Sequence, residues 1–218
     1  MTRAPELHVE LAGADTRRRL YDAARDLFTD LGFDNVTVRD ICKRAEANLA
    51  AVNYHFGDKL ALYLEVVRDA IEMMKVANEE LLAGGDVPAE ERLRRYIRSY
   101  LPRLMLVEEH HGWIQKLMRN EMADPTPGAR LIIDQVIRPR LTYLAQVVAD
   151  LLGRPVDDPA VRRTVASIQS QCLFYLPDPV KERVMPGWPE RTRASAAEAA
   201  EHVVAFSLAG IEAVKGGR

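Results

Sequence analysis

The sequence predicts an all-α protein, with an N-terminal helix-turn-helix domain over residues 1–57 and a helical effector-binding and dimerisation domain over residues 58–218. Three observations predict this class and about nine helices. Apolar residues recur at helical spacing along most of the chain, without the alternation of a strand. Two short helical patterns flank a tight turn between Thr37 and Phe56. The last helical segment is rich in alanine, which allows helices to approach closely.

The composition is that of an ordinary globular protein, because 48% of the residues are hydrophobic and 28% are charged. No run approaches the roughly 20 apolar residues that cross a bilayer, and the first residues do not resemble a signal peptide. We therefore expect a cytoplasmic protein. Cys42 and Cys172 lie on apolar helix faces, which favours two buried thiols over a disulfide or a reactive centre.

The first helix is expected over residues 15–31, with Asp15 or Thr16 as its N-cap and Gly32 as its stop. Thr37 begins a T-x-x-D pattern close to a capping box, which predicts the start of the second helix. Asn48 is a good N-cap for the third helix.

The third helix would pack Leu49, Val52 and Phe56 inward and leave a small polar face. That face, with its flanks, consists of Ala50, Ala51, Asn53, Tyr54 and His55. The alanines permit close approach to a base, Asn53 can make two hydrogen bonds to adenine, and Tyr54 and His55 can donate to phosphate or base. The alternative is a helical hairpin without a ligand, in which these side chains only pack.

If this domain binds DNA, its positive charge must be concentrated on one surface, since residues 1–60 hold 9 Lys or Arg against 10 Asp or Glu. Duplex affinity depends on neutralising phosphates. The candidate cations lie at the start of the first helix, on the second helix and after the third: Arg17, Arg18, Arg19, Arg39, Lys43, Arg44 and Lys59. Each is alternatively a solvated surface cation. Modest affinity per subunit would make dimerisation necessary.

The stretch from Leu20 to Leu64 resembles the DNA-binding domain of the TetR family of transcriptional regulators. The matching motifs are A-A-x-x-L-F at 23–28, G-F at 32–33, T-V-R-D-I at 37–41 and N-Y-H-F-G-D-K at 53–59. The resemblance implies that the third helix enters the major groove, and that Thr37, Tyr54 and Lys59 hold phosphates. The N-terminus of the following helix would assist Lys59. Base contacts would come from the region of Ala50, Ala51, Asn53 and His55, and we add Arg17, Arg39 and Asn48 to the DNA-binding set.

Two positions depart from the family pattern. Glu46 stands where the family usually has a turn glycine, and a left-handed conformation there would cost on the order of 1 kcal/mol. Asn53 stands where many members carry tyrosine, which changes the expected base contact.

Residues 111–144 resemble the CecR-type subgroup of TetR regulators. The stretch reads M-R-N-E-M-A-D-P-T at 118–126 and D-Q-V-I-R-P at 134–139. The resemblance implies an all-helical regulatory domain that binds an inducer and forms the dimer.

Helical patterns continue through this half of the chain. We expect a helix from Asp58 to about Leu82 that stops at Gly84 and Gly85, and one opened by Pro88 that Pro102 kinks. Further helices are expected over His110 to Met122, from Thr126 with a kink at Pro139, from Asp158, and over the alanine-rich C-terminal segment.

Aromatic, soft apolar and amide side chains from these helices predict an effector pocket, although each is alternatively an ordinary core residue. The pocket set is Tyr96, Tyr100, Trp113, Met118, Met122, Tyr143, Gln169 and Phe174. A metal site at His110 and His111 is disfavoured, since adjacent helical residues point about 100° apart. We expect no metal and no cofactor, apart from an unidentified small-molecule effector.

The two last long helices predict a homodimer interface, with ordinary intramolecular packing as the alternative. Its candidate residues are Val165, Ile168, Cys172, Ala199, Val203, Phe206 and Gly210. The sequence contains no catalytic motif that would indicate an enzyme. The sequence therefore predicts a ligand-responsive repressor that releases a near-palindromic operator, with a protein-interaction or architectural adaptor as the alternative.

Overall fold

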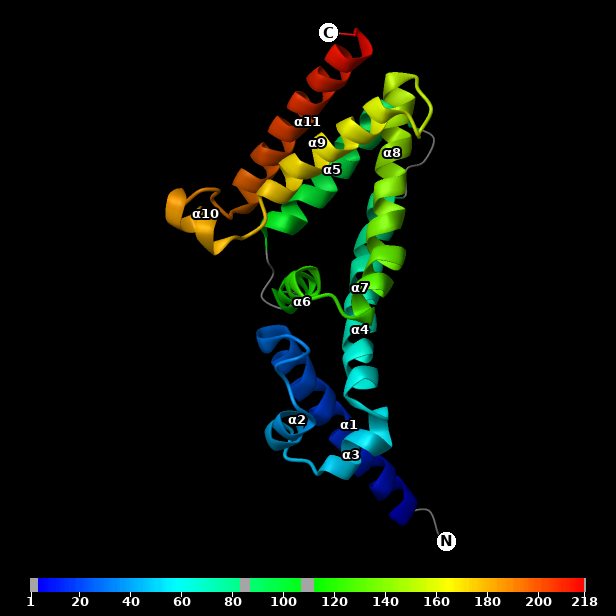
Figure 1. The fold of residues 1–218 in the computed structure, drawn as a ribbon, viewed down its shortest axis with the longest axis vertical. Coiled ribbons are helices and arrows are strands. Elements are labelled where there is room, and N and C mark those ends of the chain that lie inside the picture. The colour runs from blue at the N-terminus through cyan, green and yellow to red at the C-terminus, as the bar shows by residue number, and fades with distance from the viewer. Residues whose placement is uncertain (1–3, 83–86, 107–111, 218) are drawn as a thin grey trace. The chain divides into compact units, whose positions relative to one another are not determined.

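The computed structural model describes the backbone of residues 4–82, 87–106 and 112–217, and their side chains from Gly13 onward except at 80–82 and 179. Within these ranges every regular element is helical, as predicted (Figure 1). No helix there is both long and apolar enough to pass through a membrane. The chain divides into two compact units: residues 1–74 with 109–135, and residues 75–108 with 136–218.

The first unit contains the three N-terminal helices. They are α1 (Ala4–Leu31), α2 (Val38–Arg44) and α3 (Leu49–Phe56). The predicted start of α1 at residue 15 is wrong, because the helix begins at Ala4, and the Ala, Glu and Leu residues that precede position 15 favour its extension. Gly32 ends the helix as predicted, with a φ of 80°. Helix α4 (Lys59–Leu82) follows α3 and, by residue number, belongs to both units.

Apolar packing around α1 forms the core of the first unit. Leu20, Ala24 and Phe28 are fully buried. The Phe28 ring meets the Tyr63 ring of α4 edge-on, with the centroids 4.9 Å apart. Such pairs add to the stability that area burial provides.

Helices α6 (Gly112–Ala123) and α7 (Pro127–Ile132) also belong to the first unit. The Asn120 amide donates to the Phe28 and Thr29 carbonyls at 3.2 and 3.0 Å. The buried Glu121 carboxylate accepts hydrogen bonds from the Tyr63 hydroxyl and from the backbone and hydroxyl of Thr126. A buried carboxylate needs such donors, so this network joins α4, α6 and α7.

The second unit is a helical bundle. Its helices are α5 (Ala89–Met105), α8 (Arg138–Leu152), α9 (Pro159–Phe174), α10 (Pro179–Val184) and α11 (Arg193–Lys215). Figure 1 shows α5, α9 and α11 running alongside one another. Their inward faces form one apolar core that includes Leu93, Ile97, Val161 and Val204.

The described residues form eleven α-helices, against about nine expected. The segment expected to kink at Pro139 is instead divided into α7, a π-helical segment η1 (Ile133–Ile137) and α8. The proline-rich loop after α9 adds the short helix α10, capped by Asp178. Pro102 lies inside α5 as predicted, whereas Gly84 and Gly85 lie outside the described residues.

The turn between α2 and α3 takes a left-handed residue. Glu46 has a φ of 50°, the value expected where relatives of this motif carry glycine. The Ala47 amide donates to the Cys42 carbonyl at 3.0 Å and closes the end of α2. A side chain with a Cβ is strained in this conformation by on the order of 1 kcal/mol.

Replacing Glu46 with glycine should therefore raise the free energy of unfolding by about 1 kcal/mol. Urea denaturation at fixed protein concentration measures the change. The control is Glu212→Gly within α11, where glycine should lower stability by about the same amount. Equal signs for the two substitutions would contradict the assigned strain.

Candidate nucleic-acid interface

Thr37 and Asp40 form a capping box that fixes the start of α2. The Thr37 amide donates to the Asp40 carboxylate at 2.9 Å, and the Asp40 amide donates to the Thr37 hydroxyl at 3.2 Å. The Asp40 carboxylate also accepts from the Thr37 hydroxyl at 2.5 Å, and this hydrogen bond, followed by that from the Thr37 amide, holds the pKa of Asp40 below its usual value. The box thereby orients Thr37, which the resemblance assigned to a phosphate, at an exposed helix N-terminus.

Helix α3 is oriented by its buried face. Val52 and Phe56 point into the core of the first unit, and Asn48 caps the helix by accepting from the Ala51 amide at 2.8 Å. Leu49 differs from expectation, since about half of its side chain is exposed at the first turn. The helix can face only one way when these contacts are made, so its outer face has a defined direction.

The outer face of α3 has the small polar character that was predicted. Ala50, Asn53 and Tyr54 are exposed, with Tyr54 exposed by 85%, and Ala51 and His55 are half-buried. The Tyr54 and His55 rings lie edge-on with centroids 4.9 Å apart. An exposed amide between small residues can approach a base edge closely enough to form two hydrogen bonds.

The cations near this face are of two kinds. Arg17 forms an ion pair with Glu65 and lies over the Phe56 ring at 4.9 Å, so it braces the unit. Arg19 donates to the Ala45 carbonyl at 3.1 Å, which ties α1 to the end of α2. Arg39 is exposed on α2 and forms no ion pair or hydrogen bond with the described residues, so its charge is free to meet a phosphate.

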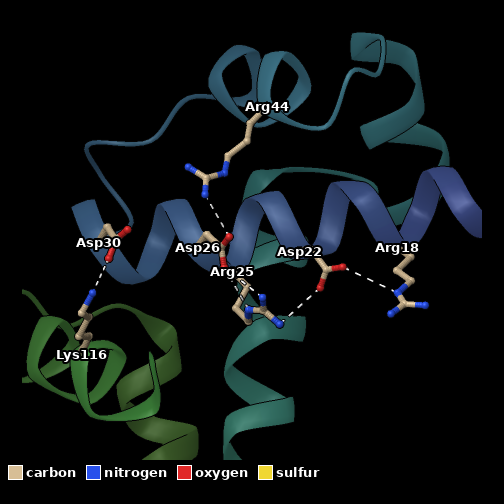
Figure 2. A network of polar contacts seen from close by, with 7 residues as sticks. All are labelled: Arg18, Asp22, Arg25, Asp26, Asp30, Arg44 and Lys116. Atoms are coloured by element: carbon tan, nitrogen blue, oxygen red, sulfur yellow. Dashed lines mark hydrogen bonds and ion pairs between the residues drawn. The ribbon is translucent and has the colours of Figure 1, made fainter. Parts of the chain in front are cut away.

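A line of ion pairs runs along α1 (Figure 2). Asp22, Asp26 and Asp30 succeed one another at helical spacing, and Figure 2 shows partners reaching them from α1, α2 and α6. Arg44 pairs with Asp26 at 3.1 Å and Lys116 pairs with Asp30 at 2.7 Å. Exposed pairs contribute little stability, but these neutralise the carboxylates of α1 and keep Arg44 turned toward that helix.

Lys59, to which the resemblance assigned a phosphate, is held by groups within the chain, and its phosphate contact stays a prediction. Its ammonium donates to the Phe33 and Val36 carbonyls, both at 2.8 Å, and lies over the Phe33 ring. Asp58 occupies the N-terminus of α4, where its carboxylate accepts from the Ala61 amide at 2.7 Å. Two of the three ammonium protons are thus used within the chain, and Lys59 holds the loop that leads into Thr37.

The residues predicted for an effector pocket are divided between the two units. Tyr96, Tyr100, Tyr143 and Gln169 meet in the second unit, where the Gln169 amide donates to the Tyr96 hydroxyl at 2.5 Å. Trp113, Met118 and Met122 lie on α6 in the first unit, and Met122 is 80% exposed. Phe174 lies against Trp188 near the end of α9. Tyr96, Tyr100, Tyr143 and Gln169 are thus the part of the predicted set that meets within one unit, and the pocket itself stays a prediction.

The dimer residues also need a correction. Ile168, Cys172 and Val203 are at most 2% exposed, because they lie on the inward faces of α9 and α11 and pack within the protomer. Val165 and Ala199 are half-buried beside the same core. Phe206 and Gly210 are exposed and remain candidates for a contact with a partner.

Among the described residues, no three His, Cys, Asp or Glu side chains are grouped so as to hold a metal ion. His110 and His111 lie outside the described residues. Sequence reasoning missed the bracing contacts of Arg19 and Arg44, for which the chain offers no local signal. The acidic residues at spacing four in α1 are the only hint of the ion pairs along that helix.

Two family models match the chain. The model of bacterial regulatory proteins of the tetR family matches residues 20–66. The model of the C-terminal domain of the HTH-type transcriptional dual regulator CecR matches residues 89–211, more than half of the chain.

Relatives agree with these matches. The HTH-type transcriptional dual regulator CecR of Shigella flexneri is 28% identical over 156 residues, which cover 68% of this chain and 70% of the relative. The HTH-type transcriptional repressor AcnR of Corynebacterium glutamicum is 33% identical over 137 residues, 59% of this chain and 65% of its own. A TetR-like transcriptional regulator from Rhodococcus sp. RHA1 has a similar fold, with a TM-score of 0.61 at 20% identity, covering 89% of this chain and 96% of its own.

The capping box predicts how the stability of the protein depends on pH. Because the pKa of Asp40 is lowered in the folded protein, its contribution to stability is full above the unfolded pKa, about 4, and is lost as the pH falls through the folded value. The stability difference between the unmodified protein and Asp40→Asn should be present at pH 7 and should shrink as the pH approaches 3. Denaturant titrations across this range measure it.

Thr192→Ala serves as the control, since it removes the N-cap of α11, where the Thr192 hydroxyl accepts from the Ser195 amide and has no carboxylate partner among the described residues. Its cost, about 1 kcal/mol, should not vary with pH over the same range. A constant effect of Asp40→Asn from pH 7 to 3 would contradict the box.

Proposed function

This chain belongs to the TetR family of bacterial regulatory proteins, with a C-terminal domain of the CecR type, and we propose that it is a homodimeric, ligand-responsive repressor. As a member of this family it is a DNA-binding regulator. The relatives support repression in part, because one is named a dual regulator and another a repressor. In the proposal, the protein holds a near-palindromic operator until a small molecule binds its C-terminal domain.

The outer face of α3 is the observation that carries the proposal. Asn53 projects from it beside Ala50 and Tyr54, while Val52 and Phe56 hold the opposite face in the core. A helix presented in this way fits the major groove, which displays a distinct pattern of donors and acceptors at each base pair. Thr37 and Arg39 lie at or near the start of α2 and would contact the flanking phosphates.

A second copy of the chain would supply a second recognition helix for the operator. One recognition helix makes few base contacts, whereas two related by a two-fold axis read half-sites about one DNA turn apart. The exposed apolar residues of α9 and α11 support this pairing: Leu173 and Phe174 at the end of α9, and Phe206 on α11 beside the exposed Ala205, Ala209 and Gly210. Small residues around one aromatic side chain allow close helix packing.

The effector would act by preferring the form of the dimer that cannot hold both half-sites. A shift of this equilibrium from 1:99 to 99:1 requires a preference of about 5.5 kcal/mol. Coupling is reciprocal, so bound operator lowers the affinity for the effector by the same factor.

Substitutions at Asn53 and Arg39 test DNA reading. Asn53→Ala should reduce discrimination at one base position in each half-site by about 1–3 kcal/mol, because each amide reads a base edge. Arg39→Ala should weaken binding to every duplex and reduce the slope of log K against log salt by about 1.8 for the dimer, because each subunit loses one phosphate contact. Fluorescence anisotropy with an operator duplex and a scrambled duplex measures both.

Arg162→Ala is the matched control, since Arg162 is exposed on α9 in the other unit and should leave both quantities unchanged. If Asn53→Ala and Arg39→Ala bind both duplexes as the unmodified protein does, the chain keeps the fold without reading DNA. That result would favour an interaction adaptor.

Dimerisation is tested at Phe206, which is 63% exposed. Phe206→Glu should convert the dimer into a monomer at micromolar concentration, because a charge would be buried against the partner. Light scattering after size exclusion measures the mass. Met122→Glu changes an even more exposed apolar residue on α6 and should leave the dimer intact. A dimer that survives Phe206→Glu would place the interface elsewhere.

A further inference from the structure

Arg140 lies against the core of the second unit without a counter-anion among the described residues. Its guanidinium carbon is 4.1 Å from the centroid of the Tyr100 ring. Its Nε is buried and has no hydrogen-bond partner, and no carboxylate among the described residues forms an ion pair with it. An arginine remains charged in a protein, and a buried N–H without an acceptor is costly. The position therefore lacks an anion that the charge would favour.

The neighbouring groups do not supply that anion. Burial raises the pKa of Tyr100, and burial raises the pKa of Cys172 to about 12, while the charge of Arg140 offsets only part of each rise. Burial likewise raises the pKa of Tyr96. All three groups are neutral at pH 7, so the positive charge of Arg140 is not balanced by a phenolate or a thiolate.

A change of helix type precedes this arginine. The π-helical segment η1, Ile133–Ile137, ends directly before α8, in which Arg140 is the third residue. Such a turn contains an extra residue and so rotates the following side chains by about 100° relative to a continuous α-helix. These turns occur frequently at functional sites. Here η1 sets the direction in which α8 presents Arg140.

Tyr100 belongs to a cluster of tyrosines that offers apolar surface and one unused donor. The Tyr96 ring centroid lies 5.7 Å from that of Tyr100 and 6.3 Å from that of Tyr143. The Gln169 amide donates to the Tyr96 hydroxyl, which leaves the hydroxyl proton for another acceptor. Arg140 and Tyr143 are half-buried, so the cluster reaches the surface of the unit at these two residues.

We propose that Arg140 and the Tyr96 hydroxyl bind the carboxylate of a small organic acid, and that this acid is the effector. The inference rests on the proposed function. A planar carboxylate can accept two parallel hydrogen bonds from a guanidinium, including one from the orphaned Nε. The apolar part of the acid would lie against the rings of Tyr100 and Tyr143.

The first test compares acids with uncharged analogues on the full-length protein. Isothermal titration would use benzoate, phenylacetate and octanoate, each beside its primary amide, and inorganic phosphate. At least one acid should bind saturably and at least about tenfold more tightly than its amide, since only the acid offers a charge-assisted pair. Equal binding of acid and amide, binding of phosphate alone, or no binding of any acid would overturn the proposal.

The second test assigns the binding to its residues. Arg140→Gln should lower the affinity for the acid by at least about tenfold. Arg140→Lys should lower it less, because the charge remains although the planar guanidinium is lost. Tyr96→Phe keeps the ring and should lower the affinity for the acid by a smaller factor. Arg162→Gln, an exposed arginine of α9, is the control and should leave the affinity unchanged. Unchanged affinity in Arg140→Gln would overturn the proposal.

Melting curves show whether each variant is folded. If Arg140→Gln does not fold, the Arg140→Lys variant and the acid–amide comparison decide.

Operator binding, followed in the same titrations, separates this inference from the proposed function. An acid that binds through Arg140 but leaves the operator bound would keep the site and reject the ligand response. The opposite result is release of the operator by an uncharged compound that has the same affinity for Arg140→Gln and for the unmodified protein. That result would reject the carboxylate site and keep a ligand-responsive repressor.

Discussion

The packing of four helices around α1 is the constraint on which the reading face depends. The buried stripe of Leu20, Ala24 and Phe28 holds α1 at the centre of the first unit. Helices α2 and α3 pack against this helix, and α4 brings Tyr63 to Phe28. Helix α6 adds the hydrogen bonds of Asn120. A change in any of these contacts would alter the direction in which α3 presents Asn53, since the buried Val52 and Phe56 hold the inner side of α3 against this core.

Ion pairs explain how a domain without excess positive charge can approach DNA. The carboxylates of Asp26 and Asp30 are met by Arg44 and Lys116 (Figure 2). Each pair neutralises a carboxylate that would otherwise repel phosphate. Arg39 is left exposed on α2, close to Thr37. Because duplex affinity follows the number of phosphates contacted, this small number of available cations fits modest binding per subunit and a dimeric reader.

Much of the first unit could be predicted from the sequence, because its signals are local. The capping box at Thr37, the cap at Asn48 and the left-handed Glu46 depend on residues only a few positions apart. Side-chain roles that depend on distant partners could not be predicted in this way. Lys59 binds carbonyls 23 and 26 residues away, and Glu121 accepts from Tyr63 across 58 residues.

In the second unit the helices were predictable, but their faces were not. Apolar periodicity located α9 and α11, yet it could not distinguish the face of Ile168 and Val203, which packs inside the protomer, from the face of Phe206. Both faces of α11 carry small or apolar residues, so the pattern alone did not separate them. Nothing in the sequence indicated the role of Arg140. Its lack of a counter-anion depends on which groups of α5 and α9 lie beside it, not on the residues of its own segment.

The central claim is that this chain, as a dimer, reads one DNA sequence through α3. Selection of the purified protein against a random duplex library at physiological salt, followed by sequencing of the retained duplexes, tests it most directly. The account predicts enrichment of one near-palindrome with half-sites about one DNA turn apart. Weak, salt-sensitive retention without any enriched sequence would contradict it.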